Sequence, residues 1–487
     1  MKTNQQDIDT PDFECAAFKR QIDDWTIVSD CFQGTSRLRE AGDTYLPQHP
    51  AEGRDSYNTR LAVAVFWNAF KRTIKGLVGM VFRKPPVLSN DVPETIRQHW
   101  ENIDFRGTHG DVFANDLFND ALRDGHVFIF VEMAPPLTDD QGNVRQAVTA
   151  PETAQRRPYW IKITKDQVVN WRTEQNANGQ PVLVQATIKE LVIEPDGLFG
   201  EVEVTQFRVL RPGSWEIWRE KSVGKETVTA KVEEGVTTLE FIPLAVVYTN
   251  RTDFFESTPP LIDQAHENLR HYRLQSDLDH VLHVANVPIK TLSGGNQETQ
   301  VIIGPDSVVR LPEGAELKYV EHQGNAIEKA QEEIEKSKRN MATLGLSLLM
   351  DKSKTQTTAT EIIVDDEAQS SELSSMAQGV QDGIEQALIF HAAYLALPQG
   401  GSVEINREFR KFVLTPEKIA RYSDMVARDQ MSLELMLETL ARASEFPDDF
   451  NLQQELERVA KAKKERADLG AEVLRGFDQD QPPGMVQ

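Results

Sequence analysis

The sequence lacks several features that would place it in a common protein class. It has only two cysteines, Cys15 and Cys31, among 487 residues, too few for a disulfide framework or a structural zinc site. No apolar run is long enough to span a membrane, and the first twenty residues lack both the hydrophobic core of a signal peptide and the arginine-rich character of a transit peptide. We therefore expect a protein made in the cytoplasm, without a membrane partner, whose cysteines are ordinary packed thiols.

Positive charge is also scarce, since the formal net charge is −23 and the pI is near 5.0. This balance speaks against a protein that binds nucleic acid tightly, because phosphate binding requires clustered Lys and Arg side chains. It does not exclude nucleic acid that moves past the protein with only weak contacts. The length predicts two or more domains, or one elongated subunit that packs against copies of itself.

Motifs for catalysis and for metal binding are missing. The chain has no GxxxxGK[ST] loop, no GxGxxG between a strand and a helix, and no GxSxG elbow. "HENLRH" puts His266 and His271 one residue too far apart for the HExxH zinc pair, so the two rings would not share a helix face. Acidic pairs such as Asp365-Asp366 and Asp448-Asp449 fall on segments predicted to be solvated. We therefore predict that the protein is not an enzyme and uses no cofactor or metal.

The first half of the chain predicts a mixed α/β region. Polar, turn-rich sequence extends to about residue 58, and apolar residues at helical spacing then predict one long buried helix that ends at Pro85-Pro86. A second helix stops at Gly125 and leads into the strand "HVFIFVEM". Residues 158–256 predict strands, because β-branched and aromatic runs are separated by turn signals at Asn178-Gly179, Pro195-Asp196-Gly197 and Pro212-Gly213.

The second half predicts helices on either side of a small β insertion. Ser257 or Thr258 is expected to cap the first helix, with Pro259 in its first turn. A β-like insertion at 284–324, with strands "TQVIIG", "SVVRL" and "LKYVEH", precedes an amphipathic helix at 325–349. The polar loop "MDKSKTQTTATEI" leads to a long helix over 362–397, in which Gly379 and Gly383 are weak points or close-packing sites.

The C-terminal part begins with the strand-like "SVEINREF". Helices are predicted at 416–429, at 432–445 and, highly charged, at about 450–475. The final "DQDQPPGMVQ" is predicted to be disordered.

This order of elements resembles the portal proteins, or head-to-tail connectors, of tailed double-stranded-DNA bacteriophages, and especially a portal-like phage family long regarded as uncharacterised. The resemblance covers about residues 40–465 and rests on a succession of segments, each weakly specific alone. They are "YNTRLAVAVFWNAFKRTIKGLVGMVFRKPP", "LEFIPLAVVYTN", "PPLIDQAHENLRHYRLQSDLDHVLHVANVPI", "TATEI" and "VEINREFRKFVLTPEKIARYSDMVARDQMSLELMLETL".

The resemblance implies an α+β fold, as an elongated portal-type subunit with a mixed α/β wing, a two-helix stem, a small β-rich clip, a long kinked helix and a helical crown. Its boundaries would be wing 1–257, first stem helix 258–283, clip 284–324, second stem helix 325–349, tunnel loop 350–361, long helix and remaining wing 362–415, and crown 416–487 with a disordered tail.

The family's function implies a homo-oligomeric ring, typically of twelve subunits, around a DNA channel at one capsid vertex. Double-stranded DNA would be packaged, retained and ejected through it, and a separate terminase motor would load the DNA. Further partners would be head-completion or tail adaptor proteins and the major capsid and scaffold proteins. The protein would be located in the virion, after assembly in the host bacterial cytoplasm.

The tunnel loop supplies the residues that would meet DNA in the channel: Lys352, Ser353, Lys354, Thr355, Thr357 and Thr358. A few lysines among small hydroxyl residues give transient phosphate contacts and little base readout. Without the resemblance, the same composition is typical of a solvated connection. Further candidate DNA-facing cations are Lys338, Arg339, Lys461, Lys463, Lys464 and Arg466, although Glu455, Glu457 and Glu465 favour an ordinary solvated helix around the last four.

Two other functions stay open at this stage. A minor structural or scaffold-interacting virion protein would share the missing catalytic motifs but would not need this order of helices, clip and loop. A hydrolase in the N-terminal α/β region is the enzyme alternative, and it would reveal itself by a metal or phosphate requirement.

Overall fold

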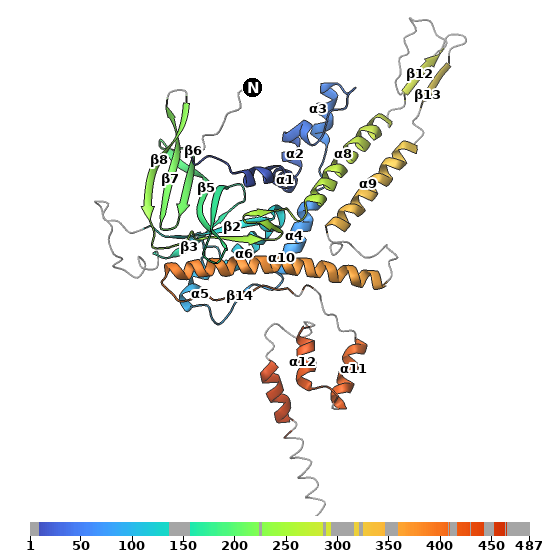
Figure 1. The fold of residues 1–487 in the computed structure, drawn as a ribbon. Helices are drawn as coiled ribbons and strands as arrows, with labels where there is room; N and C mark the ends of the chain where they lie inside the picture. Colours follow the sequence, from blue (N-terminus) through green and yellow to red (C-terminus); the bar gives the residue numbers. More distant parts are fainter. Residues whose placement is uncertain are drawn as a thin grey trace, which may run out of the picture. The chain divides into compact units, whose positions relative to one another are not determined.

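The computed structural model describes residues 9–135, 156–223, 226–285, 289–293, 316–320, 325–345, 359–407, 409, 416–428, 430–442, 452–462 and 464. They belong to two compact units, Met1–Glu408 and Phe409–Gln487. The fold is α+β, as predicted, with antiparallel sheets and long helices in separate stretches of the chain (Figure 1).

Helices dominate the start of the first unit, where the sequence predicts polar, turn-rich chain. They are α1 (Ala16–Gln33), α2 (Thr35–Ala41), the 3-10 helix η1 (Gly42–Thr44), α3 (Arg54–Val63) and α4 (Ala69–Val81). The turn-rich prediction is wrong because α1 carries a buried face of Phe18, Trp25, Val28 and Cys31 at helical spacing. Cys31 is a buried free thiol and Cys15 is half-buried, as expected for packed cysteines.

Residues 64–68 separate α3 from α4, so the single long helix predicted up to Pro85-Pro86 is also wrong. Buried Ala64 and Phe66 alternate here with exposed neighbours, which is the period of extended chain. The side-chain oxygen of Asn68 accepts a hydrogen bond from the backbone N–H of Lys71 at 2.8 Å and so begins a new helix.

The strands form two main sheets, and most of them were predicted. After α5 (Glu94–Trp100) and α6 (Gly110–Asp124), which ends at Gly125 as expected, β2 (His126–Met133) pairs antiparallel with both β3 (Pro158–Ile163) and β9 (Leu244–Tyr248). The second sheet is a meander of five antiparallel strands: β4 (Val168–Gln175), β5 (Pro181–Asp196), β6 (Gly200–Arg211), β7 (Ser214–Val223) and β8 (Glu226–Val236). Gly179, Gly197 and Gly213 have positive φ at the predicted turns.

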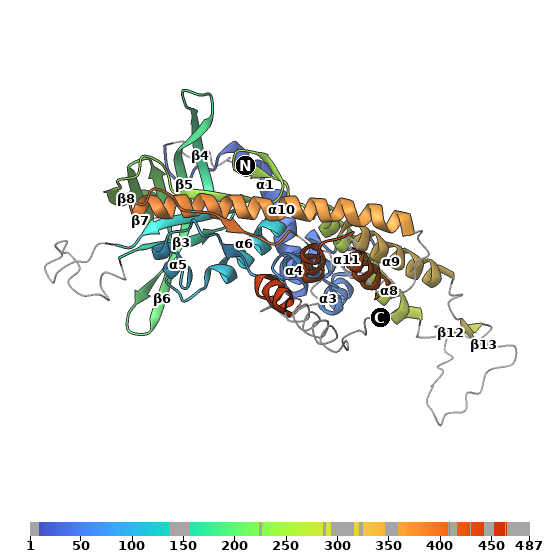
Figure 2. The ribbon, with the colours of Figure 1, turned by 90° about the horizontal axis from the view of Figure 1, so that it is seen from below.

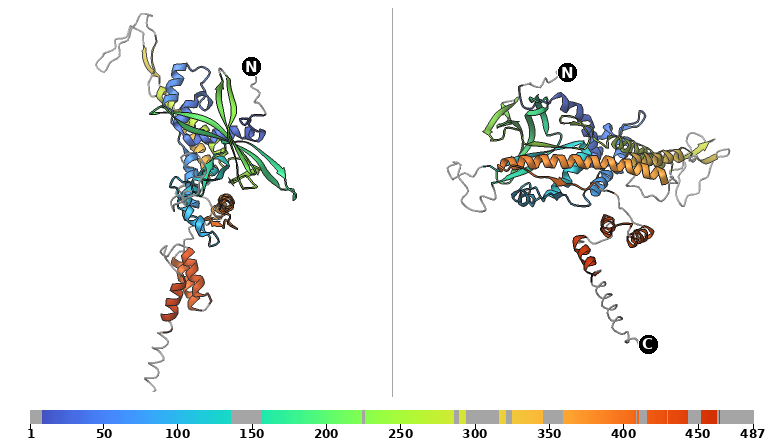
Figure 3. Two further views of the ribbon diagram at one scale, coloured as in Figure 1. Left: turned by 90° about the vertical axis from the view of Figure 1, so that its left-hand side faces the viewer. Right: turned by 60° about the horizontal axis from the view of Figure 1, so that its bottom comes forward.

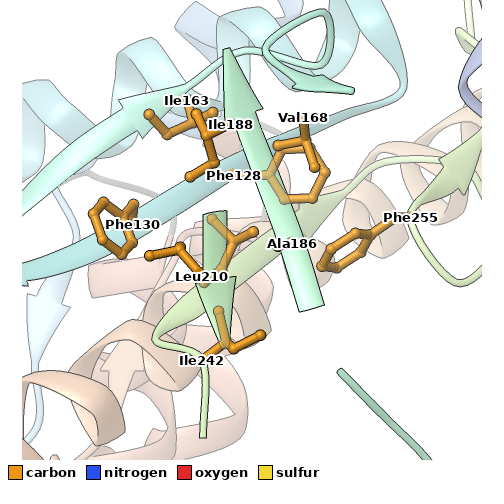
Figure 4. Close-up of a cluster of buried hydrophobic side chains, with 10 residues drawn as sticks. Phe128, Phe130, Ile163, Val168, Ala186, Ile188, Leu210, Ile242 and Phe255 are labelled. Atoms are coloured by element: carbon orange, nitrogen blue, oxygen red, sulfur yellow. The ribbon is translucent and has the colours of Figure 1, made fainter. Parts of the chain in front are cut away.

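A hydrophobic core lies between these two sheets (Figure 4). Phe128 and Phe130, two residues apart in β2, lie on the same face of the strand. They pack with buried residues of β4, β5 and β6, namely Val168, Ala186, Ile188 and Leu210. The other face of β2 and β9 is covered by helices, so β2 is buried on both sides.

The long helix α10 (Ala359–Tyr394) covers that second face, and Figures 1 and 3 show it lying along the three-stranded sheet. A Cβ atom built on Gly379 would lie 1.9 Å from the carbonyl oxygen of Tyr248, and one on Gly383 would lie 2.5 Å from Val247 Cγ2. Both glycines are therefore close-packing sites, one of the two roles predicted for them. Apolar side chains at helical spacing on α10 are buried at Leu373, Met376, Val380, Ile384 and Leu388.

Short pairings complete the first unit. β1 (Val87–Leu88) pairs with β14 (Val403–Glu404) next to the carboxyl end of α10, and β10 (Arg251–Asp253) pairs with β11 (Glu256–Ser257).

In the second unit, α11 (Pro416–Ala427) and α12 (Leu433–Arg442) match the predicted helices, and the Ser432 hydroxyl caps α12 by accepting from the N–H of Leu435. Residues 452–462 are helical, and the predicted disordered tail lies outside the described residues.

The glycine contact yields a direct prediction. Gly379→Ala should lower the free energy of unfolding of the first unit by about 1–3 kcal/mol, the usual cost of overpacking, because the new methyl group meets backbone that cannot rotate away. Urea denaturation followed by tryptophan fluorescence measures it. Gly79→Ala on α4 is the matched control, because its Cβ would meet nothing within 4 Å and the change should stabilise by up to about 1 kcal/mol. Equal effects of the two substitutions would contradict the close-packing role.

Candidate functional site

The candidate site is the segment from α8 to α10, which carries the predicted channel loop. α8 (Ile262–Ala285) and α9 (Asn325–Leu344) lie side by side in Figure 1, with the hairpin of β12 (Ile289–Ser293) and β13 (Glu316–Val320) between them in the chain. The hairpin register runs from Ile289 opposite Val320 to Ser293 opposite Glu316. The predicted strand "LKYVEH" is thus β13, whereas "TQVIIG" and "SVVRL" lie outside the described residues.

The start of α8 differs from the prediction. Ser257 lies in β11, where its hydroxyl pairs with His126 Nδ1 at 2.6 Å, and the helix begins only at Ile262. Neither Ser257 nor Thr258 therefore caps this helix, and Pro259 precedes it and does not lie in its first turn. The buried hydroxyl of Ser257 instead satisfies the buried imidazole of His126, which has a stronger need for a partner than an exposed helix end.

Two buried amides fix α8 to its neighbours. Gln264 Nε2 donates to Thr73 Oγ1 in α4 at 2.7 Å and to the carbonyl oxygen of Met341 in α9 at 3.1 Å. Asn268 accepts from the backbone N–H of Phe70 at 3.0 Å and donates to the carbonyl oxygen of Trp67 at 2.9 Å. Because buried amides without partners are costly, these contacts set one register for α8 against α4 and α9.

The end of α9 is held at the same place. A Cβ atom on Gly345 would lie 2.1 Å from Gln264 Nε2, so the chain leaves α9 in close contact with α8. Nearer the hairpin, Arg270 Nη2 and Glu333 Oε2 form an ion pair across the two helices at 2.8 Å. The chain therefore enters the predicted tunnel loop from a fixed position.

On the other side of that loop, α10 has 36 residues, a length of about 54 Å. Figures 1 and 2 show its amino-terminal part extending beyond the sheet, while its carboxyl-terminal part packs against the strands. His391 anchors this second part, because its ring nitrogens lie 2.9 Å from His99 Nδ1 and 3.2 Å from Trp160 Nε1, which donates to it. The helix thus joins a buried anchor to the predicted loop.

The predicted DNA-facing residues are distributed as follows. The six loop residues Lys352 to Thr358 lie outside the described residues, as do Lys463 and Arg466. Lys338 is held by Glu335 at 2.6 Å and lies 6.0 Å from the ring centre of Trp67, whereas Arg339 beside it is exposed. Lys461 and Lys464 are exposed on the helical stretch in the second unit.

The motifs rejected in the sequence do not form sites among the described residues. His266 is exposed, whereas His271 is buried against Trp67 with ring centres 5.5 Å apart, so the two histidines do not share a face. The described part of the chain contains no group of three or more His, Cys, Asp or Glu side chains that could hold a metal ion. It also contains no helix long and apolar enough to cross a membrane.

Comparison with known proteins points to the same segment. Residues 260–395 match a family described as a domain of unknown function (DUF4055), which here spans α8, the hairpin, α9 and α10. The matched region is well under half of the chain. No curated protein matches the sequence.

Among solved structures, the chain is similar to three from gene transfer agent particles, each at 12% identity. The neck of an empty particle with C6 symmetry has a TM-score of 0.41, covering 78% of this chain and 90% of that chain. The neck of a native particle with C12 symmetry has a TM-score of 0.40, covering 82% and 96%, and the virion of a native particle has 0.40, covering 81% and 94%.

The buried histidines make the first unit sensitive to acid. Burial lowers the pKa of both His391 and His126 to about 3, and nearby cationic groups add to the shift. The folded state therefore keeps both rings neutral, while the unfolded chain takes up protons below about pH 6.5. Stability is full above that pH and falls as pH decreases, by about 2 kcal/mol for each of these histidines at pH 5.

His391→Gln tests this dependence. The variant should be less stable than the parent at pH 7.5, because two ring contacts are lost, yet its further loss between pH 7.5 and pH 5 should be smaller by about 2 kcal/mol. Urea midpoints at both pH values provide the measurement. His266→Gln, at an exposed position, should leave the pH dependence unchanged, and an identical slope in all three proteins would refute the assignment to His391.

Proposed function

We propose that this chain is the subunit of a phage portal, a ring around a DNA channel at one capsid vertex, through which the genome is packaged, retained and ejected and to which the tail is joined. The observation that supports it best is the order α8, hairpin, α9, loop, α10 within one unit. The same order of elements carries the resemblance to portal proteins. In this role the protein is structural and catalyses no reaction.

The contacts on both sides of the loop explain why a channel function suits this segment. Gln264 holds the end of α9, and Gly379, Gly383 and His391 hold α10 against the sheet and its neighbours. The chain between two such fixed helices, which contains most of the predicted tunnel loop, could be presented at the same position by every subunit of a ring. Its two lysines would then meet the DNA backbone from all sides.

The charge of the chain favours weak contact with the DNA. A net charge of −23 per subunit would repel a polyanion from the channel walls, so that Lys352 and Lys354 provide brief contacts and little retention. A conduit gains from this balance, whereas a protein that binds DNA permanently would not.

The proposed partners follow from this role. The hairpin end of α8 and α9 would contact the terminase and later the head-completion or tail adaptor proteins, while the two main sheets would face the capsid and scaffold proteins. The protein would be located in the virion after assembly in the host cytoplasm.

Negative-stain electron microscopy and native mass spectrometry of the purified protein test the proposal. Closed rings with a central hole, and a mass close to twelve times 55.0 kDa, are expected. A monodisperse monomer or dimer at all concentrations and salt conditions would refute it.

The loop itself yields a second prediction. Lys352→Ala/Lys354→Ala should leave ring formation intact and impair DNA packaging or retention, because the loop's phosphate contacts are lost. Genome content of particles assembled with the variant measures this effect. Arg172→Ala/Lys231→Ala, which removes two exposed cations from the five-stranded sheet, is the matched control. Normal packaging by the loop variant would contradict the role of these lysines.

A further inference from the structure

One stretch of the chain has the opposite charge to the rest. From Ser56 to Asn90 there are six Lys or Arg residues and no Asp or Glu, although the whole chain has 53 basic and 76 acidic residues. Five of these cations are exposed, and together they are here called the basic strip: Lys71, Arg72, Lys75, Arg83 and Lys84. Such a local excess of one sign in a protein of the other sign creates a strong local field.

The fold places Lys71, Arg72 and Lys75 of the basic strip on the free side of α4, and Arg83 and Lys84 just after its end. The opposite side of the helix is buried against α1, α6 and α8 through Phe70, Ile74, Leu77, Val78 and Val81. Lys71 lies over the ring of Phe32 at 4.8 Å. Among the residues that the structure describes, Arg72, Lys75, Arg83 and Lys84 form no ion pair, so their charge is available to a partner.

Exposed apolar side chains lie next to the strip in the sequence. Val63, at the end of α3, is 64% exposed, and in the extended segment that follows Val65 is 61% exposed and Trp67 is 46% exposed. Large apolar side chains beside cations are typical of a protein partner, because the centre of a protein interface is apolar and its rim is charged. DNA would instead favour polar and basic side chains throughout.

The same chain has a surface of complementary character on α1. A cavity of about 360 Å³ lies between α1 and β4, with apolar walls from Phe18, Ile22, Trp25 and Val169. Glu14 and Asp166 also line it, together with Lys189 and two buried groups that already have partners: Asp30, paired with Arg37 at 2.8 Å, and Lys165, bound to Asp124 at 2.7 Å. Asp23, which follows Ile22 on α1, is exposed, and neither Asp23 nor the exposed Asp166 has an ion-pair partner among the described residues. The α1 face is defined here as this cavity with Asp23.

We propose that the basic strip of one subunit docks on the α1 face of the next subunit. The inference rests on the proposed ring and deepens it by naming the surfaces that join neighbours. A contact between two different surfaces of the same chain is heterologous, which is the kind of contact that generates rings. Charge complementarity would position the two surfaces, and the exposed valines and Trp67 would supply apolar burial.

The contact also answers an electrostatic difficulty of such a ring. Subunits of net charge −23 repel one another at long range, and this repulsion must be overcome wherever two copies touch. A local pairing of the basic strip with free carboxylates provides attraction at the place of contact and weakens with salt.

Charge reversal on each side tests the contact. Variant A carries Arg72→Glu/Lys75→Glu and variant B carries Asp23→Lys/Asp166→Lys. Each alone places like charges in the contact, so half-assembly into rings should require a protein concentration higher by about tenfold or more. Mass photometry and sedimentation velocity at low salt measure the assembly. Thermal unfolding of the isolated variants checks that both remain folded.

An equal mixture of A and B is the decisive sample. In a ring where A and B alternate, every contact again joins opposite charges, so the mixture should assemble close to the concentration that the parent needs. Lys461→Glu/Lys464→Glu, two exposed lysines of the second unit, is the matched control for a general change in net charge and should assemble like the parent.

The possible failures are distinguishable. If the parent forms no rings, the proposed function fails. If the parent forms rings and variant A assembles normally, the proposed function stands and the docking of the strip on α1 is refuted. If A assembles normally but loses retention of double-stranded DNA in a filter-binding assay, the basic strip is a DNA surface. If the mixture of A and B stays unassembled although each variant is folded, the two surfaces do not meet.

Discussion

The close approach of α10 to β9 is the contact on which the rest of the first unit depends. Gly379 and Gly383 bring helix backbone against the carbonyl oxygens of Tyr248 and Val246, and no residue with a side chain fits there without displacing backbone. The contact fixes α10 against the three-stranded sheet, whose other face carries the hydrophobic core. His391 adds a second attachment through His99 and Trp160. The carboxyl-terminal part of α10 is therefore fixed to the first unit at two places.

The fixed position of α10 explains how it could hold a loop in place in the proposed channel. A loop that touches moving DNA must be held by elements that do not yield, since a contact that shifts with the DNA exerts no control over it. The amides of Gln264 and Asn268 provide the equivalent anchorage on the α8 and α9 side. Rigidity on both sides of residues 346–358 therefore separates two tasks. In the proposed channel the helices would set the position of the loop, and its lysines and hydroxyl groups would set its contact with phosphate.

Much of this arrangement could be predicted from periodicity, because the stripe of Leu373, Val380 and Ile384 and the strands on either side of Gly179 and Gly213 carry clear signals. Two errors have physical causes. The polar spacing of α1 hid Phe18 and Trp25, and in residues 64–68 an alternating pattern with Asn68 as a cap competed with apparent helical spacing. The contacts of Gln264, Asn268 and His391 could not be predicted, because they join residues far apart in the chain. The only sequence signal for these contacts was the position of the three polar residues within helix faces that are otherwise apolar and buried.

The central claim is that the loops before α10 converge on the axis of a ring. Inter-subunit distances between spin labels test it most directly, in a background where Cys15→Ser leaves only the buried Cys31. Labels on Gln356→Cys, in the loop, should give short distances between neighbouring subunits. Arg106 follows α5, whose His99 contacts His391 near the carboxyl end of α10. Labels on Arg106→Cys should therefore give clearly longer distances between neighbouring subunits, because α10 is about 54 Å long. Longer distances for position 356 than for position 106 would place the loop at the periphery and contradict the account.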